Sequence, residues 1–193
     1  MAPASAVCLP SQDLPMKGDF QMLLFGTAGT AQFQIHPVDA ASELPAILEV
    51  YRQCEDFLAL GPVGQASLAM VQADLAHSAA EGGVFCGIYD HASGLMLGIV
   101  DFMLSGFEGD PSRAFLSLLM IAVPYRSQGL GGAVVRLVED EIRRAGQARA
   151  IKSGVQINNP QAIRFWQRMA YRIISDAQPF PDGTVAYQLW KDL

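Results

Sequence analysis

The sequence lacks several features that would assign a protein to a class at once. Its three cysteines, Cys8, Cys54 and Cys86, show no metal-ligand spacing, and an odd, scattered set is typical of reduced thiols. No apolar run reaches the roughly 18 residues needed to cross a bilayer. The first residues lack the basic and apolar regions of a secretory signal. We therefore expect no metal site, no contact with a membrane and a cytoplasmic location.

Positive charge is also scarce. The chain has 13 lysines and arginines against 19 acidic residues, a net charge of −6. A nucleic-acid-binding surface needs clustered basic residues, so this class is excluded. An acidic protein can still attract a cationic partner. Hydrophobic residues make up 51% of the 193 residues, which predicts one well-packed domain.

Hydrophobic periodicity divides the chain into an irregular leader and one folded domain. Residues 1–32 contain three prolines and three glycines and predict a leader that can add one strand. Residues 33–193 form the predicted domain. Its strands are expected at 33–38, 84–89, 94–104, 114–123, 150–157, 171–175 and 184–190, and its helices at 44–58, 66–79, 129–145 and 160–169. Because the central strands are almost wholly apolar, we expect an α/β or α+β fold whose sheet has helices on both faces.

The expected helix at 129–145 is strongly amphipathic. We expect its polar face to carry two pairs at i,i+4 spacing, Glu139 with Arg143 and Asp140 with Arg144.

A glycine-rich turn precedes this helix and is the most informative feature of the sequence. The run comprises Arg126, Ser127, Gln128, Gly129, Leu130, Gly131 and Gly132. A helix start has unpaired N–H groups and the positive end of a dipole, and glycines allow a phosphate to approach the backbone. Arg126 adds a fixed positive charge. The run therefore suits a pyrophosphate, although its glycine spacing alone fits an ordinary strand-to-helix turn equally well.

This turn resembles that of the GNAT superfamily of acyl-CoA N-acyltransferases. The motif of that family, Arg or Gln, two residues, Gly, one residue, then Gly or Ala, is met by Arg126, Gly129 and Gly131. A second family element, an Asn-x-x-Ala start followed by an aromatic pair, is matched at 159–166. The resemblance covers roughly residues 33–191.

The resemblance implies a single GNAT-like domain with a central mixed, mostly antiparallel sheet, and acetyl-CoA as co-substrate without a metal. The backbone at Ile121, Ala122 and Val123 would pair with pantetheine, and the N–H groups of residues 126–132 would hold the pyrophosphate. Asn159 would lie near the pantetheine arm while also capping a helix. Trp166 stands where the family has a tyrosine acid, and Ala170 stands where glycine is common.

Candidate bases come from two acidic positions. Asp101 interrupts an apolar strand, where an unpaired charge is costly to bury. It either faces the substrate or has a structural role, ending the regular strand or pairing with an arginine. Glu108 lies in a loop that can border the acceptor site or simply face solvent. These residues are the catalytic candidates.

The sequence and the resemblance together predict an acetyl-CoA-dependent N-acetyltransferase. Its acceptor would be a primary amine of a small molecule or a peptide that can carry positive charge, and the protein would be a monomer or a homodimer. Two alternatives stay open: a CoA-binding regulatory module without turnover, and transfer to a hydroxyl or from a longer acyl donor.

Overall fold

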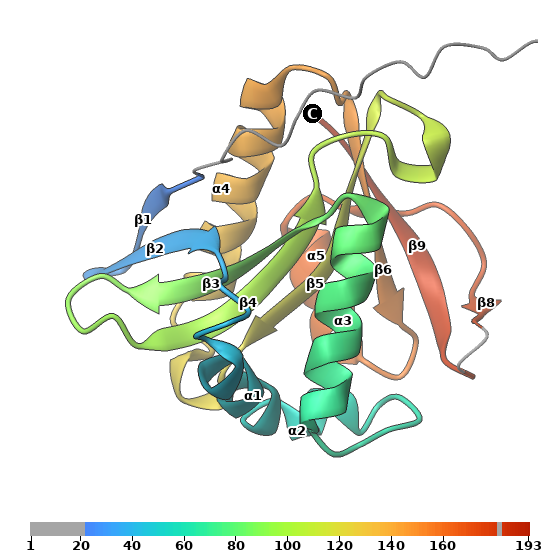
Figure 1. Cartoon of the computed structure of the whole chain (residues 1–193). Helices are drawn as coiled ribbons and strands as arrows, with labels where there is room; N and C mark the ends of the chain where they lie inside the picture. Colours follow the sequence, from blue (N-terminus) through green and yellow to red (C-terminus); the bar gives the residue numbers. More distant parts are fainter. Residues whose placement is uncertain (1–21, 181–182) are drawn as a thin grey trace, which may run out of the picture.

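A nine-stranded sheet forms the centre of the molecule. The computed structural model describes residues 22–180 and 183–193. The strand order is β1-β2-β3-β4-β5-β6-β9-β7, with β8 also paired to β9 (Figure 1). Every pair is antiparallel except β5 with β6. The strands are β1 (Leu24–Ala28), β2 (Ala31–Pro37), β3 (Val84–Asp90), β4 (Met96–Met103), β5 (Arg113–Ile121), β6 (Ala150–Gln156), β7 (Arg172–Ile173), β8 (Gln178–Pro179) and β9 (Val185–Asp192).

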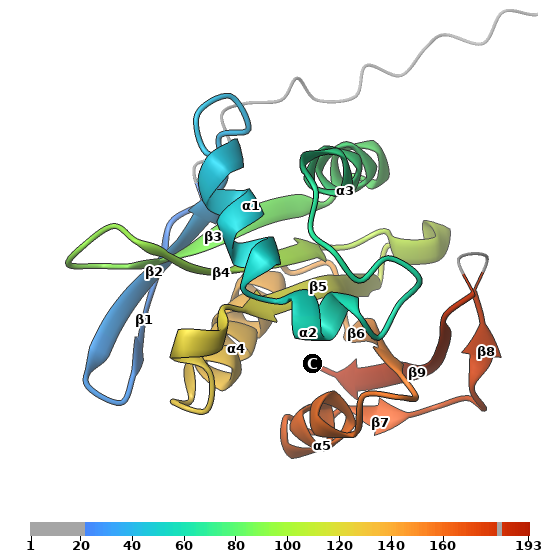
Figure 2. The ribbon, with the colours of Figure 1, turned by 90° about the horizontal axis from the view of Figure 1, so that it is seen from below.

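Helices cover both faces of this sheet, so each face has its own hydrophobic core. Helices α1 (Leu44–Arg52), α2 (Glu55–Leu58) and α3 (Leu68–Glu81) lie on one face, and α4 (Leu130–Ala145) and α5 (Pro160–Arg168) lie on the other (Figure 2). Two 3₁₀ turns, η1 (Phe107–Gly109) and η2 (Val123–Tyr125), flank β5. The predicted mixed, mostly antiparallel sheet between two helical layers is confirmed. No helix within the described ranges is long and apolar enough to cross a bilayer.

Local sequence signals explain most helix ends. The Ser67 hydroxyl accepts the Met70 N–H at 3.2 Å and begins α3, and Gly82 ends that helix with a φ of 76°, where a residue with a Cβ would be strained. The Asn159 side chain accepts the Ala162 N–H at 3.0 Å and begins α5.

The early part of the domain differs from the sequence prediction. The helix expected at 44–58 is interrupted after Arg52, and α2 begins at Glu55. Residues 22–32 of the expected leader contain β1, in agreement with the one strand that this segment was expected to be able to add, and β2 begins at Ala31, two residues before the predicted start. Residues 1–21 of that leader lie outside the described residues.

Helix α4 occupies its predicted position, but its charges pair differently. Glu139 is buried and accepts two hydrogen bonds from Lys191 of β9, each 2.7 Å long, while Arg143 lies 3.7 Å from it. Arg144 pairs with the buried Glu141. The predicted pair of Asp140 with Arg144 is therefore wrong, and Glu139 does not lie on an exposed face.

Candidate functional site

The site begins where β5 and β6 separate. These strands pair only between Arg113–Leu116 and Ala150–Ser153, and the Ser153 hydroxyl donates to the Leu116 carbonyl at 2.8 Å where the pairing ends. At the same point β5 carries one extra residue, Ser117, opposite the Asp101–Phe102 step of β4. An extra residue of this kind bends a strand. The bulge therefore accompanies the separation of the two strands.

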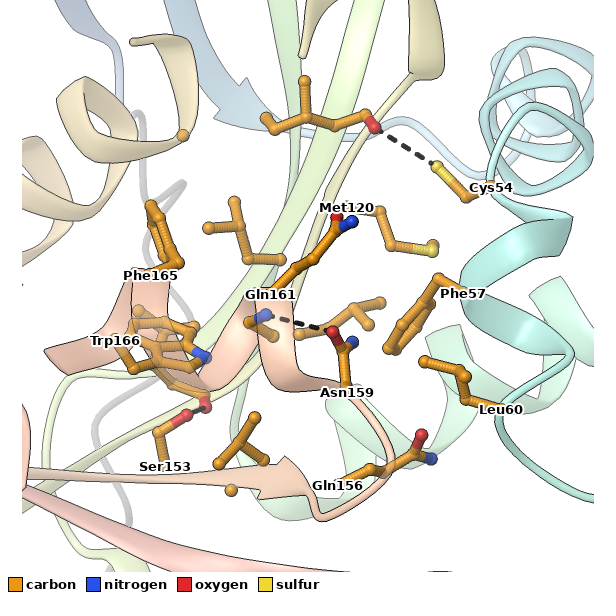
Figure 3. A pocket seen from close by; sticks show the side chains of 18 of the residues that line it. Cys54, Phe57, Leu60, Met120, Ser153, Gln156, Asn159, Gln161, Phe165 and Trp166 are labelled. Carbon is orange, nitrogen blue, oxygen red and sulfur yellow. Dashed lines mark hydrogen bonds between the residues drawn. The ribbon is translucent and has the colours of Figure 1, made fainter. Parts of the chain in front are cut away.

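A pocket of about 1390 Å³ fills the space between the separated strands. Phe165 and Trp166 of α5 line one side, and Phe57 and Leu60, which lie in and just after α2, line another (Figure 3). The starts of α4 and β9 complete the wall. Residues of both helical layers thus line the pocket.

The glycine-rich turn forms one end of this pocket. Ser127 and Gly129 have φ values of 62° and 82°, which turn the chain sharply into α4. No side chain caps α4, so the N–H groups of its first turn have no acceptor within the helix. A Cβ at Gly131 would lie 3.6 Å from the Phe165 ring, so a side chain here would narrow the pocket. The turn therefore has the free donors and the space that an anion needs.

Not every residue of the run faces the pocket. Arg126, Ser127, Gly129, Gly131 and Gly132 line it. The other two members, Gln128 and Leu130, do not: the Gln128 side chain donates to the Pro124 carbonyl, and Leu130 is buried in the core.

Arg126 is already paired inside the pocket. Its guanidinium donates to both carboxylate oxygens of Asp56, at 2.5 and 3.1 Å, and its Nε donates to the Ile121 carbonyl at 2.6 Å. The hydrogen bond from Arg126 lowers the pKa of Asp56. Arg126 therefore connects α2 to the end of β5, a contact between residues 70 positions apart that no local pattern indicates.

Beyond the point where β5 and β6 separate, one edge of β5 has no partner strand among the described residues, and the Ile121 carbonyl on this edge accepts only from side chains, Arg126 among them. The Ala122 N–H donates to the Leu97 carbonyl of β4 at 2.9 Å. Because backbone groups alternate in direction along a strand, those of Leu119 and Ile121 face the pocket. Of the three residues that we expected to pair with pantetheine, Ile121 lines the pocket, whereas Ala122 and Val123 do not.

Asp101 lies on β4, beside the point where β5 and β6 separate, and it does not line the pocket. It is 8% exposed, and its two carboxylate oxygens accept hydrogen bonds from Ser78 of α3 at 2.6 Å and from Ser117 at 2.5 Å. No ion pair involves Asp101 in the described part of the chain. The pairing with an arginine that we considered is therefore wrong. Ser117 is exposed and lines the pocket, so its hydroxyl connects the buried carboxylate to the cavity.

Other polar groups surround Asp101 on the same helical layer. The Tyr51 hydroxyl donates to Asp74 at 2.6 Å, and burial raises the pKa of Asp74. His77, on the same helix as Asp74, lines the pocket. The sequence alone did not single out Asp74 or His77 as functional candidates, because single polar residues on a helix are common.

Glu108 lies away from the pocket. It accepts from Lys152 at 2.7 and 2.9 Å and from Arg113 at 2.9 Å, and the hydrogen bond from Lys152 is the main cause of its lowered pKa. Glu108 neither lines the pocket nor faces solvent without partners. Its contacts are those of an ion-pair network.

The aromatic residues near α5 leave the pocket without a phenol. Trp166 lines the pocket, is 6% exposed and packs edge-to-face on Tyr171 at 4.9 Å. Tyr171 is buried and does not reach the pocket, and no other tyrosine of the described residues lines it. Ala170 has a φ of 65°, a left-handed conformation that favours glycine. Asn159 also lines the pocket while it caps α5.

No group of three or more histidine, cysteine or acidic residues that could hold a metal occurs in the described part of the chain.

Comparison with known proteins agrees with this arrangement. The sequence model of the acetyltransferase (GNAT) family matches residues 45–171. None of the curated proteins matches the sequence significantly. Among solved structures, an acetyltransferase from Thermus thermophilus has a TM-score of 0.66 and 22% identity over 83% of this chain and 97% of its own. A GCN5-related N-acetyltransferase from Kribbella flavida has a TM-score of 0.63 and 20% identity over 83% and 98%. The NatC complex bound to Gag peptide and CoA gives a TM-score of 0.60 and 15% identity over 83% and 98%.

Proposed function

Because the chain belongs to the GNAT family of acetyltransferases, we propose that it transfers the acetyl group of acetyl-CoA to a primary amine. One observation carries the proposal: a turn with uncapped N–H groups, a strand edge without a partner strand, and the Ser117 hydroxyl that donates to Asp101 border one pocket. The CoA in the structurally similar NatC complex supports the choice of donor.

The pocket offers acetyl-CoA three kinds of contact. The free N–H groups at the start of α4 suit its pyrophosphate. The unpaired backbone groups of Leu119 and the N–H of Ile121 suit the amides of its pantetheine arm, which would extend the sheet as an added strand. The apolar side chains of α5 would cover the arm. Asn159, which lines the same pocket, would contact it.

Proton removal is assigned to Ser117 and Asp101 acting together. An alkyl ammonium has a pKa of about 10, so it must lose a proton before it attacks. The amine N–H would pass its proton to the Ser117 oxygen while the Ser117 hydroxyl proton moves to Asp101 over the 2.5 Å contact. The neutral amine nitrogen then forms its bond to the thioester carbon and gives its second proton to water, the carbon–sulfur bond breaks, and the CoA thiolate leaves. With no tyrosine of the described residues lining the pocket, we assign the protonation of the thiolate to water.

Thiol release tests the proposal directly. The purified protein is incubated with acetyl-CoA and a panel of primary amines and alcohols, and free CoA thiol is measured together with the mass of each acceptor. We expect amine-dependent thiol release and an acetylated amine. Binding of CoA without release for any acceptor would indicate a regulatory module, and release with alcohols alone would indicate a hydroxyl acceptor. Either result would contradict the proposed function.

A further inference from the structure

Resting on the proposed function, we propose that the acceptor is an apolar monoamine, with one ammonium group on an aliphatic or aromatic body. The charges and the apolar residues of the pocket define this class.

The pocket has almost no free negative charge. Among its described lining residues Asp56 is the only carboxylate, and both of its oxygens accept from Arg126. The other charged lining residue, Arg168, is also basic. A polyamine carries several ammonium groups, and each one needs a negative or strongly polar partner when it is taken from water. The described lining residues offer no second carboxylate; their other polar side chains are the imidazole of His77 and uncharged amides and hydroxyls.

One position can receive a single ammonium group. Ser117 is exposed in the pocket, and behind it the carboxylate of the buried Asp101 accepts from hydroxyls alone among the described residues, those of Ser78 and Ser117. A buried carboxylate without a cation attracts one. Of the titratable groups near Asp101, Asp74 of α3 is acidic and Tyr51 of α1 is neutral, so neither opposes a cation there.

The body of the acceptor would contact apolar side chains. Leu118 and Met120 follow Ser117 on β5 and line the same pocket. Phe57 and Leu60 face them from the α2 side (Figure 3), and both are half-buried, so they have surface left to cover. Phe180 lines the pocket and is 46% exposed. Covering such surface removes apolar area from water and so favours binding of an apolar body.

A matched pair of acceptors tests this inference. Pentylamine and 1,5-diaminopentane have the same carbon chain and differ by one terminal ammonium. We expect kcat/KM for pentylamine to exceed that for the diamine by about tenfold or more, because the second charge has no partner. Equal values, or a preference for the diamine, would overturn the inference while leaving the proposed function intact. No thiol release with either amine, despite CoA binding, would instead contradict the proposed function.

A charge placed in the pocket gives a second, independent test. Leu60→Asp supplies a carboxylate on the apolar wall, and we expect it to shift the ratio of kcat/KM values toward the diamine by about tenfold. Leu95→Asp is the control, because Leu95 is 54% exposed and does not line the pocket. Circular dichroism verifies that both variants fold. If Leu60→Asp does not fold, the comparison of pentylamine with the diamine on the wild-type protein still tests the inference. An unchanged ratio in folded Leu60→Asp would count against an apolar acceptor site. A peptide α-amine used better than pentylamine would overturn the inference.

Discussion

The two ends of the β5–β6 strand pair show opposite arrangements of the same residue types. At the closed end the strands are hydrogen-bonded, Phe107 stacks on Phe115 at 3.9 Å, and Glu108 is held by Lys152 and Arg113. At the open end the strands separate at Ser117, and the Asp101 carboxylate accepts from hydroxyls alone among the described residues. A carboxylate satisfied by cations stabilises the sheet, whereas one that reaches a cavity through a hydroxyl can exchange a proton.

The largest expected effect is at the open end. We expect Asp101→Asn to lower kcat/KM by about 10²- to 10³-fold at pH 7, because the amide cannot accept the proton from Ser117. The deficit should shrink as the pH rises toward the amine pKa of about 10, where the free amine exists without a base. The measurement is thiol release between pH 6 and 10, with the CoA dissociation constant as the control. A constant deficit across that range would remove Asp101 from proton transfer.

The glycine-rich turn at the same end provides the next test. We expect Arg126→Glu to weaken CoA binding by about 10- to 100-fold, because it places a negative charge beside the phosphate and beside Asp56. Asp56→Asn is the matched variant, since it frees the guanidinium and should leave CoA binding equal or tighter. Isothermal titration calorimetry measures both. Unchanged affinity in Arg126→Glu would show that this turn does not hold the pyrophosphate.

A substitution at the closed end should change the stability of the protein and leave its activity unaltered. We expect Glu108→Gln to lower the free energy of unfolding by about 1 kcal/mol, since Lys152 loses its charged partner while Glu108 is partly exposed. The pKa of Glu108 is lowered on folding, so its contribution is present above the unfolded pKa and is lost as the pH falls through the folded one. Urea unfolding at pH 7 and at pH 3 should therefore show a larger difference at pH 7 than at pH 3. A large loss of kcat/KM in a Glu108→Gln variant of unchanged stability would instead indicate that Glu108 takes part in catalysis.

The smallest effect concerns Asp74, beside the open end, whose pKa shifts in the opposite direction. Burial raises the pKa of Asp74, so folding disfavours its charged form and stability is lost as the pH rises through the folded value. Asp74→Asn keeps an acceptor for the Tyr51 hydroxyl and removes the charge. We expect it to raise stability at pH 8 by less than about 1 kcal/mol, with a gain that declines toward pH 4. Thermal unfolding at both pH values measures this, and a gain that grows at low pH would contradict it.

Local signals predicted much of the fold. Ser67, Gly82 and the Asn159–Pro160 step act within one helical turn, and the structure places helix ends at each. The apolar runs at 84–89 and 114–123 correspond to β3 and β5, because a continuous apolar run is also a local signal.

Contacts between distant residues account for what the sequence did not predict. Glu139 is buried because Lys191 of β9 supplies two hydrogen bonds, which the periodicity of α4 does not reveal. Arg126 binds Asp56 across 70 positions. The hydroxyl of Ser117 gains its importance only from the fold, which places it against Asp101, whereas the sequence singled out the carboxylate alone.

The bulge at Ser117 also suggests how such a pocket can arise from an ordinary sheet. Leu116 and Leu118 lie on opposite faces of β5, beside Phe102 and Asp101 of β4, so removal of the residue between them would leave a regular ladder with each side chain still in its own core. Nothing in that ladder would bend β5 away from β6. The extra residue at Ser117 therefore coincides with the change from a regular ladder to the open end of the sheet.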